Sequence, residues 1–283
     1  MVSLEGMYDL HVHASPSIAP RKLTALEALK RASAEGMGGF LLVDHTYNTA
    51  MVAQVLNEME YETEVFGAII LNESVGALNP FVVEAAIRMG ARQIEMPTYS
   101  ARNHKEKYGD DQTIFPYQTG PMGCYILNDR GRLNPEVEDI LQLLRESHCF
   151  LGTGHLSVPE IEVLVARAKE LHLQVLVNSV SLDMIDMPLS IQKRLAADNV
   201  FMEHDYTAFT DIVRKKTPIE SIVEQIREVG AERCIIASDA GNPNIPDLFV
   251  ALKDFIRRLL KNGITENEVN LMTRETPRLL LAS

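Results

Sequence analysis

Two histidines one residue apart stand at the end of an apolar stretch near the start of the chain. The stretch reads Met7-Tyr8-Asp9-Leu10-His11-Val12-His13. In an extended strand, side chains at positions i and i+2 point to the same face, so His11 and His13 project together. Neutral imidazole is a common ligand of zinc and related divalent metals. This spacing therefore predicts part of a metal site.

The elements that would hold these histidines alternate along the chain. Short apolar runs predict strands at 7–13, 39–45, 65–72, 92–96, 149–155, 174–178, 199–204 and 233–238. Amphipathic stretches predict helices near 24–36, 49–61, 80–89, 135–146, 158–171, 188–197, 218–229 and 246–261. Runs such as Phe40-Leu41-Leu42-Val43 are typical of parallel strands buried on both faces. Eight strand–helix pairs favour an α/β fold of the (β/α)8 TIM-like barrel type. An open, doubly wound sheet is the rival, but no GxGxxG motif follows the first strand.

Length and composition bound the class of protein. The chain has 283 residues, 46% of them hydrophobic, and a formal charge of -12. That length suits one barrel domain over 1–283, because such a barrel commonly needs about 250 residues. The one long irregular segment, 97–133, is expected to be an inserted loop that folds over the mouth of the barrel. The acidic balance disfavours nucleic acids and anionic membranes as partners.

Targeting signals are not evident in the sequence. The first residues lack a basic region followed by an apolar one, and no apolar run approaches the length of a membrane span. The three cysteines have no paired spacing, which fits a reducing compartment. We therefore expect a cytoplasmic protein that acts on a small molecule and forms a homo-oligomer.

Further potential ligands follow the other predicted strands. They are Asp44 and His45, Asn72 and Glu73, Glu95, His155, Asn178, the run Glu203-His204-Asp205, and Asp239. Active sites of such barrels lie at the C-terminal ends of the strands, so these side chains should converge there. Nitrogen and carboxylate ligands together suit zinc, manganese or iron.

This set of motifs resembles the amidohydrolase superfamily. That family carries HxH on the first strand, a Lys or Glu on the fourth, histidines on later strands and an Asp on the eighth. The matching positions here are His11, His13, Glu95, His155 and Asp239. The resemblance implies that they hold one or two divalent cations, zinc foremost, and that Asp239 is also the catalytic base. His204 would supply the remaining histidine, although it lies on the seventh predicted strand. Asn178 stands where the family usually has that histidine, and we expect Asn178 to contact the substrate.

The N-terminal part also resembles the polymerase-and-histidinol-phosphatase family of metal phosphoesterases. Asp9-Leu10-His11-Val12-His13 is similar to its opening motif, and Val43-Asp44-His45 to its second. Glu73 could match its third-strand acid. The closing Ser238-Asp239-Ala240-Gly241 lacks that family's final histidine.

Several residues have two interpretations. His45 is expected to contact substrate or to hydrogen-bond a loop carbonyl. Glu95 is a ligand or the partner of a nearby arginine, and Asp44 orients a ligand histidine. Tyr99 and Arg102, with His104, Lys105 and Lys107, are either solvated or form an anion-binding part of the segment 97–133.

The leading functional hypothesis is a metal-dependent hydrolase of an amide, lactone or ester bond. Divalent cations activate water near neutral pH, and Asp239 would move its proton to the leaving group. Its substrate is small, and anionic if the segment 97–133 binds charge. The alternatives are a phosphoesterase, a metal-dependent decarboxylase, and a non-catalytic barrel that binds a metal and a small ligand.

Overall fold

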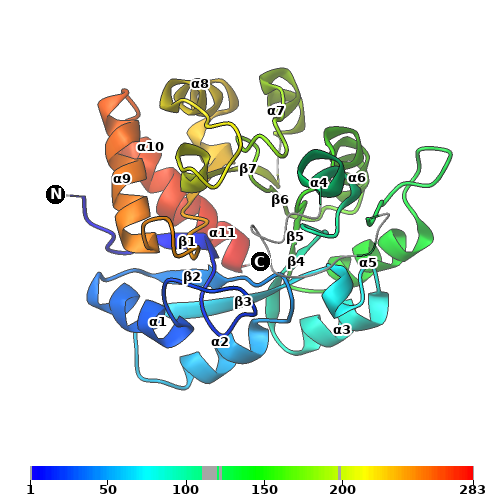
Figure 1. Cartoon of the computed structure of the whole chain (residues 1–283), viewed down its shortest axis with the longest axis horizontal. Helices are drawn as coiled ribbons and strands as arrows, with labels where there is room; N and C mark the ends of the chain where they lie inside the picture. The colour runs from blue at the N-terminus through cyan, green and yellow to red at the C-terminus, as the bar shows by residue number, and fades with distance from the viewer. Residues whose placement is uncertain (1, 110–119, 121–122, 197–198, 283) are drawn as a thin grey trace.

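Eight parallel strands form one sheet whose order follows the chain. The computed structural model describes residues 2–109, 120, 123–196 and 199–282. The strands are β1 (Tyr8–Val12), β2 (Gly39–Leu42), β3 (Glu64–Ile70), β4 (Ala91–Glu95), β5 (Phe150–Gly152), β6 (Val175–Val177), β7 (Val200–Asp205) and β8 (Cys234–Ala237). A bridge between Val12 and Ala240 joins the two ends of the sheet, and His13 N donates to Ala240 O at 2.8 Å. The predicted (β/α)8 barrel is confirmed (Figure 1).

Most of the helices surround the barrel and cover the outer faces of the strands (Figure 1), whereas the C-terminal helix packs Leu280 and Leu281 against the barrel interior. The helices follow in chain order. They are α1 (Ala25–Ala34), α2 (Ala50–Asn57), α3 (Pro80–Arg88), α4 (Arg102–Tyr108), α5 (Pro135–Arg145), α6 (Val158–Glu170), α7 (Leu189–Leu195), α8 (Ile219–Val229), α9 (Leu248–Lys261), α10 (Glu266–Asn270) and α11 (Thr276–Ala282). All eight predicted helices are present. The sequence reasoning missed α4, α10 and α11. α4 lies within the segment expected to be irregular, and residues 110–119 and 121–122 of that segment lie outside the described part of the chain.

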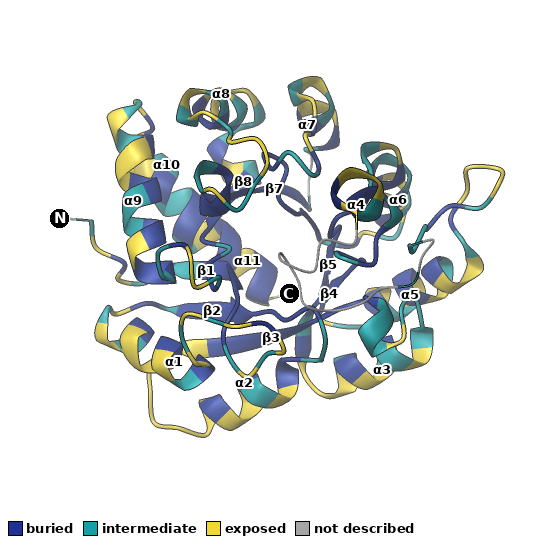
Figure 2. Ribbon diagram, in the orientation of Figure 1, coloured by how far each residue is buried: buried dark blue, intermediate teal, exposed yellow. Residues whose placement is uncertain are grey.

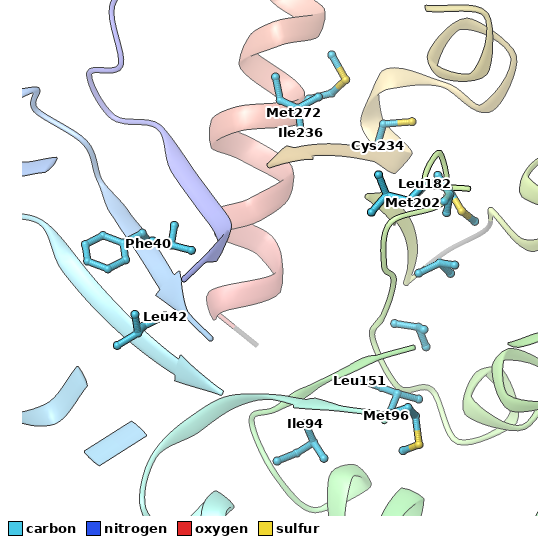
Figure 3. Close-up of a cluster of buried hydrophobic side chains, with 14 of the residues drawn as sticks. Phe40, Leu42, Ile94, Met96, Leu151, Leu182, Met202, Cys234, Ile236 and Met272 are labelled. Carbon is cyan, nitrogen blue, oxygen red and sulfur yellow. The ribbon is translucent and has the colours of Figure 1, made fainter. Parts of the chain in front are cut away.

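Two apolar layers hold the barrel together, because successive residues of a strand face opposite sides of the sheet. Phe40 and Leu42 belong to the outer layer, between strands and helices, which Figure 3 shows in close-up. Leu41 and Val43 belong to the inner layer with Phe150, Phe201 and the α11 residues Leu280 and Leu281. In Figure 2 the strands are mostly buried, while the helices expose their outer sides. The barrel interior is thus packed rather than open.

The inner face changes character along several strands. On β7 it runs from Phe201 to Glu203 and Asp205, all buried. On β6 it runs from Leu176 to Asn178, and past β8 from Ile235 to Asp239. An apolar plug therefore fills the start of the barrel, and polar side chains gather at the C-terminal ends of the strands.

Candidate metal centre

The site is built around three side chains from the first and last strands. One potential ligand atom of each of His11, His13 and Asp239 lies within 4.8 Å of the other two. The Oδ1 atom of Asp239 is 3.5 Å from Nε2 of His11 and 3.3 Å from Nε2 of His13. All three side chains line a cavity of about 480 Å³. This is the cluster that the HxH motif predicts.

Local backbone features orient these three side chains. The register of β1 against β2 shifts between Asp9 and Val12, and such an irregularity can redirect a side chain. Asp9 Oδ1 accepts from the backbone N–H groups of His11 and Ser238, at 3.2 and 3.1 Å, and so ties β1 to β8. Asp239 has a φ of +47°, a conformation that Asp adopts more readily than most residues. Thr207 Oγ1 donates to its Oδ2 at 2.6 Å, which leaves Oδ1 toward the histidines.

Buried carboxyl groups lie beneath the histidines. His11 Nδ1 is 3.3 Å from Glu203 Oε2, which also accepts from Asn178 Nδ2 at 2.9 Å. His11, Glu203 and Asp205 form a second group whose ligand atoms lie within 4.8 Å. Burial raises the pKa of Glu95 to about 8 and that of Asp205 well above its usual range, and the charge of Glu203 adds to both.

These carboxyl groups suit a cation. Among the described residues, Oε2 of Glu95 and Oε1 of Glu203 are buried without a hydrogen-bond partner. Buried polar atoms are normally paired, so orphaned carboxylate oxygens beside two imidazoles call for a positive ligand. The mixed nitrogen and oxygen donors fit zinc, manganese or iron. The residues present therefore fit a divalent metal.

The three residues at the centre of the site, His11, His13 and Asp239, differ in the direction of their pKa shifts. Burial opposes the protonation of His11, but the carboxylates of Asp239 and Glu203 outweigh it and raise the pKa of His11 well above its usual value. Burial and the nearby Arg21 guanidinium lower the pKa of His13 to about 4. Burial would raise the pKa of Asp239, yet His11 and His13 together hold it at about 2. Asp239 is therefore ionised at neutral pH.

Three further histidines surround the cavity. His155 Nδ1 lies 2.9 Å from Nδ1 of His104, and the two rings stack at 4.9 Å. His45 Nδ1 lies 2.9 Å from Thr98 Oγ1, and its ring packs 4.7 Å from that of His13. Burial lowers the pKa of all three, so they are neutral and able to act as ligands. With Tyr99, they line the same cavity as Asp239.

The structure thus brings together most of the predicted site residues. His11, His13, His45, Tyr99, His155 and Asp239 all line the cavity. Glu95 lies close enough for the charges of His11 and Asp239 to act on its pKa, although it is not part of the cavity wall. Asn178, predicted to bind substrate, also lies behind the wall, where its amide donates to Glu203 and accepts from Gly154 N. Its observed role is to position a carboxylate.

His204 is a correction to the predicted ligand set. Its neighbours Glu203 and Asp205 face the barrel interior, so the alternation of the strand turns His204 outward. There its Nδ1 lies 2.8 Å from Ser181 Oγ, which donates onward to Gln225 of α8 at 2.7 Å. Burial alone lowers the pKa of His204 to about 3. It is a packed residue between strand and helix.

Arg102 is a second correction. Neither Arg102 nor Lys107 supplies the positive charge expected over the mouth of the barrel. Helix α4 turns His104 and Tyr108 toward the cavity, since positions i and i+4 share a helix face. Arg102 instead lies over the ring of Tyr125, 4.4 Å from its centroid, beside a separate hollow. Lys107 Nζ donates to the carbonyl of Met184 at 2.8 Å. The described residues of this segment that line the cavity are therefore Tyr99, His104 and Tyr108.

The sequence gives no role to Tyr108 or Arg21, and it does not show which of Glu203, His204 and Asp205 face the barrel interior. The inward position of Glu203 and Asp205 depends on which face of β7 looks inward, and the apolar residues of that strand do not reveal it. His104 and Tyr108 carry a weak signal, their spacing of four residues. Arg21 also lines the cavity, and no motif surrounds it.

Fold and site together define an eight-stranded parallel barrel with residues that could bind a metal at the C-terminal ends of its strands. Residues 6–203 match the model of a family of unknown function, DUF6282, and the chain belongs to that family. No curated protein sequence matches the chain.

Solved structures with the same fold include barrels of the amidohydrolase type. An amidohydrolase from Pseudomonas aeruginosa has a TM-score of 0.67 at 12% identity, covering 98% of this chain and 95% of its own. A protein from Pseudomonas putida, assigned as a 2-pyrone-4,6-dicarboxylic acid hydrolase, has a TM-score of 0.61 at 13% identity, with coverage of 99% and 98%. A phosphotriesterase from Mycobacterium tuberculosis has a TM-score of 0.59 at 14% identity, with coverage of 98% and 94%. At these identities the likeness shows the fold.

The second resemblance, to the polymerase-and-histidinol-phosphatase family, is not shown by these matches. None of the described helices is long and apolar enough to cross a membrane.

Proposed function

We propose that this protein is a metal-dependent hydrolase that cleaves an amide, lactone or ester bond of a small molecule. The observation that carries the proposal is the cluster of His11, His13 and Asp239 at the mouth of the barrel, with ligand atoms within 4.8 Å and a cavity of about 480 Å³ above them. The fold shared with hydrolases of the amidohydrolase type supports it.

The residues that would hold a divalent cation are His11, His13 and Asp239, with His155 and Glu95 close by. When bound, the cation supplies Lewis acidity, which makes water nucleophilic near neutral pH and polarises the scissile carbonyl. Glu203 accepts at Nδ1 of His11 and so fixes the ring with Nε2 toward Asp239. The ring of His155 is oriented by His104, whose Nδ1 lies within hydrogen-bond distance of Nδ1 of His155.

Asp239 is the candidate general base. It is ionised at neutral pH, and the hydroxyl of Thr207 fixes one of its oxygens. The other oxygen is therefore available to take a proton from attacking water and return it to the leaving group. The aromatic rings of Tyr99 and Tyr108 wall the cavity and limit the access of bulk water to the reacting atoms.

The first experiment measures metal content and then activity. Purified protein is analysed for zinc, manganese and iron, and the metal found is restored before a screen of amides, lactones, esters and phosphoesters. We expect bound metal and hydrolysis of a carboxylic ester, lactone or amide. A protein that holds no metal, or a metal-loaded one that hydrolyses none of these, refutes the proposal. Activity on phosphoesters alone would favour the phosphoesterase alternative. Release of carbon dioxide would favour the decarboxylase alternative.

Two variants separate chemistry from folding in this screen. His13→Ala should lose metal and activity, whereas His204→Ala should keep both, because His204 faces away from the cavity. The small-molecule substrate and a homo-oligomeric, cytoplasmic state remain part of this proposal.

A further inference from the structure

A single arginine lines the cavity of the candidate metal centre. Arg21 lies in the loop between β1 and α1, and its side chain is only 8% exposed. It is the one lysine or arginine among the described residues of the cavity wall.

The guanidinium of Arg21 is held in place but not satisfied. Its Nε donates to Ser17 Oγ at 3.2 Å, and its Nη2 lies 3.6 Å from Asp44 Oδ2, beyond hydrogen-bond reach. Asp44 Oδ1 accepts from Thr46, whereas its Oδ2, which forms an ion pair with Arg21, is buried without a hydrogen-bond partner. Within the described part of the chain, neither Nη atom of Arg21 has a hydrogen-bond acceptor, and Nη2 is buried. The guanidinium therefore has N–H groups with which it can bind a further acceptor.

The loop around Arg21 is anchored on both sides. Lys22 N donates to Gly241 O at 2.8 Å, and Lys22 Nζ donates to Pro243 O at 2.9 Å. Ser15 N donates to Leu23 O at 2.9 Å. The bonds of Lys22 tie the loop to the segment after β8, which carries Asp239, and the bond from Ser15 to Leu23 closes the loop on itself. The arginine is therefore fixed relative to the candidate metal ligands.

We propose that Arg21 binds a carboxylate of the substrate, so that the substrates are small carboxylic acids with an apolar body. The planar fork of a guanidinium matches a carboxylate with two parallel hydrogen bonds. A phosphate dianion would call for more cations than the described wall supplies, because Arg21 is its one lysine or arginine. The apolar residues of the cavity wall include Leu182, Met184, Ile212 and Val213.

The choice of substrate class rests on the proposed function, but the binding of a carboxylate at Arg21 does not. The test therefore begins with metal-free protein. Calorimetric titration with benzoate, benzamide and inorganic phosphate is done on wild type, Arg21→Gln and the control Arg102→Gln. The control removes the same charge from a residue outside the cavity. The double variant Arg21→Gln/Asp44→Asn removes the buried pair together and so avoids an unpaired Asp44.

We expect benzoate to bind wild type and Arg102→Gln equally, and at least tenfold more weakly to Arg21→Gln and to the double variant. The affinity for benzamide should be the same in wild type and in every variant. The proposal is overturned if wild type binds benzoate no better than benzamide, or if the double variant keeps the affinity of wild type for benzoate. Phosphate that binds more tightly than benzoate, and through Arg21, would also overturn the carboxylate assignment.

A second measurement links Arg21 to turnover in the metal-loaded protein. The mono-p-nitrophenyl ester of glutaric acid is compared with the same ester whose free carboxyl is methylated. Wild type should prefer the free acid by at least tenfold in kcat/KM, and Arg21→Gln should lose that preference through KM. Equal kcat/KM for both esters in wild type overturns the substrate class. Hydrolysis of neither ester counts against the proposed function, while the benzoate titration still decides the role of Arg21.

Discussion

Replacing Glu95 with glutamine should stabilise the metal-free protein at alkaline pH. Burial raises the pKa of Glu95 from 4.5 to about 8, so the folded state holds its proton across a window where the unfolded chain has lost it. Wherever the folded state binds more protons, stability falls as pH rises. The stabilising contribution of protonated Glu95 is therefore complete below pH 4.5 and is lost as pH rises toward 8.

The magnitude follows from the same pKa values. One pKa unit is worth 1.36 kcal/mol, so a rise from 4.5 to about 8 costs about 5 kcal/mol once Glu95 must ionise in the folded state. Relaxation of the site and entry of water relieve part of this cost. Glutamine keeps the shape of the side chain and never ionises. The variant should therefore match wild type near pH 5 and exceed its stability by a few kcal/mol at pH 8.5.

Scanning calorimetry of protein treated with a chelator measures this difference. A kcal/mol corresponds to about 2–4 °C in Tm for chains of roughly this size, so the Tm of the variant should be higher by roughly 5–10 °C at pH 8.5. Glu60→Gln, at an exposed position, is the matched control and should show no pH-dependent gain. Added zinc should reverse the order, because ionised Glu95 then has a cation beside it. A Tm difference that is the same at pH 5 and pH 8.5 would refute the buried, protonated carboxyl.

Three further outcomes test the site. Asp239→Asn should lower kcat by at least about 100-fold with little change in KM, since an amide fills the space but does not accept a proton; steady-state kinetics with restored metal checks this, and unchanged kcat would make the aspartate structural. His13→Ala should lose bound metal by elemental analysis while His204→Ala retains it, and the reverse result would restore His204 as a ligand. Metal affinity should increase with pH through the neutral range, because the raised pKa of His11 makes a proton compete with the cation; titration calorimetry in buffers of different ionisation enthalpy should detect the released proton, and its absence would contradict the charged imidazole.

The barrel and the convergence of His11, His13 and Asp239 could be predicted from sequence because both depend on local patterns. Apolar runs separated by capped helices indicate parallel strands, and Thr24 does form the expected capping box with Glu27. His11, His13 and Asp239 stand at strand ends, where the fold itself brings distant residues together. No knowledge of side-chain packing is needed for either inference.

His204 and Arg102 show where local patterns fail. A strand of alternating side chains has two possible orientations, and the run Glu203-His204-Asp205 places ligand-type residues on both faces. Only the packing of His204 against Ser181 fixes which face is buried in the barrel. Grouping Arg102 with its neighbours assumes that they share one surface, but Arg102 and His104 are two positions apart on α4 and so lie on different faces of the helix. In both cases the residue type was suggestive and its direction was unknown.

Arg21 was missed for a different reason, which bears on how the cavity selects a ligand. A loop arginine has no sequence signature, and its burial depends on bonds from Lys22 to a segment more than 200 residues away. Those bonds place a fixed positive group beside a centre whose lower wall is rich in carboxyl groups. Glu203 and Asp205 favour a cation beneath His11, whereas Arg21 favours an anion in the cavity wall. In the proposed hydrolase, the substrate would place the oxygen of its scissile bond toward the cation and its carboxylate toward Arg21. The two charged groups would therefore select one orientation of the substrate.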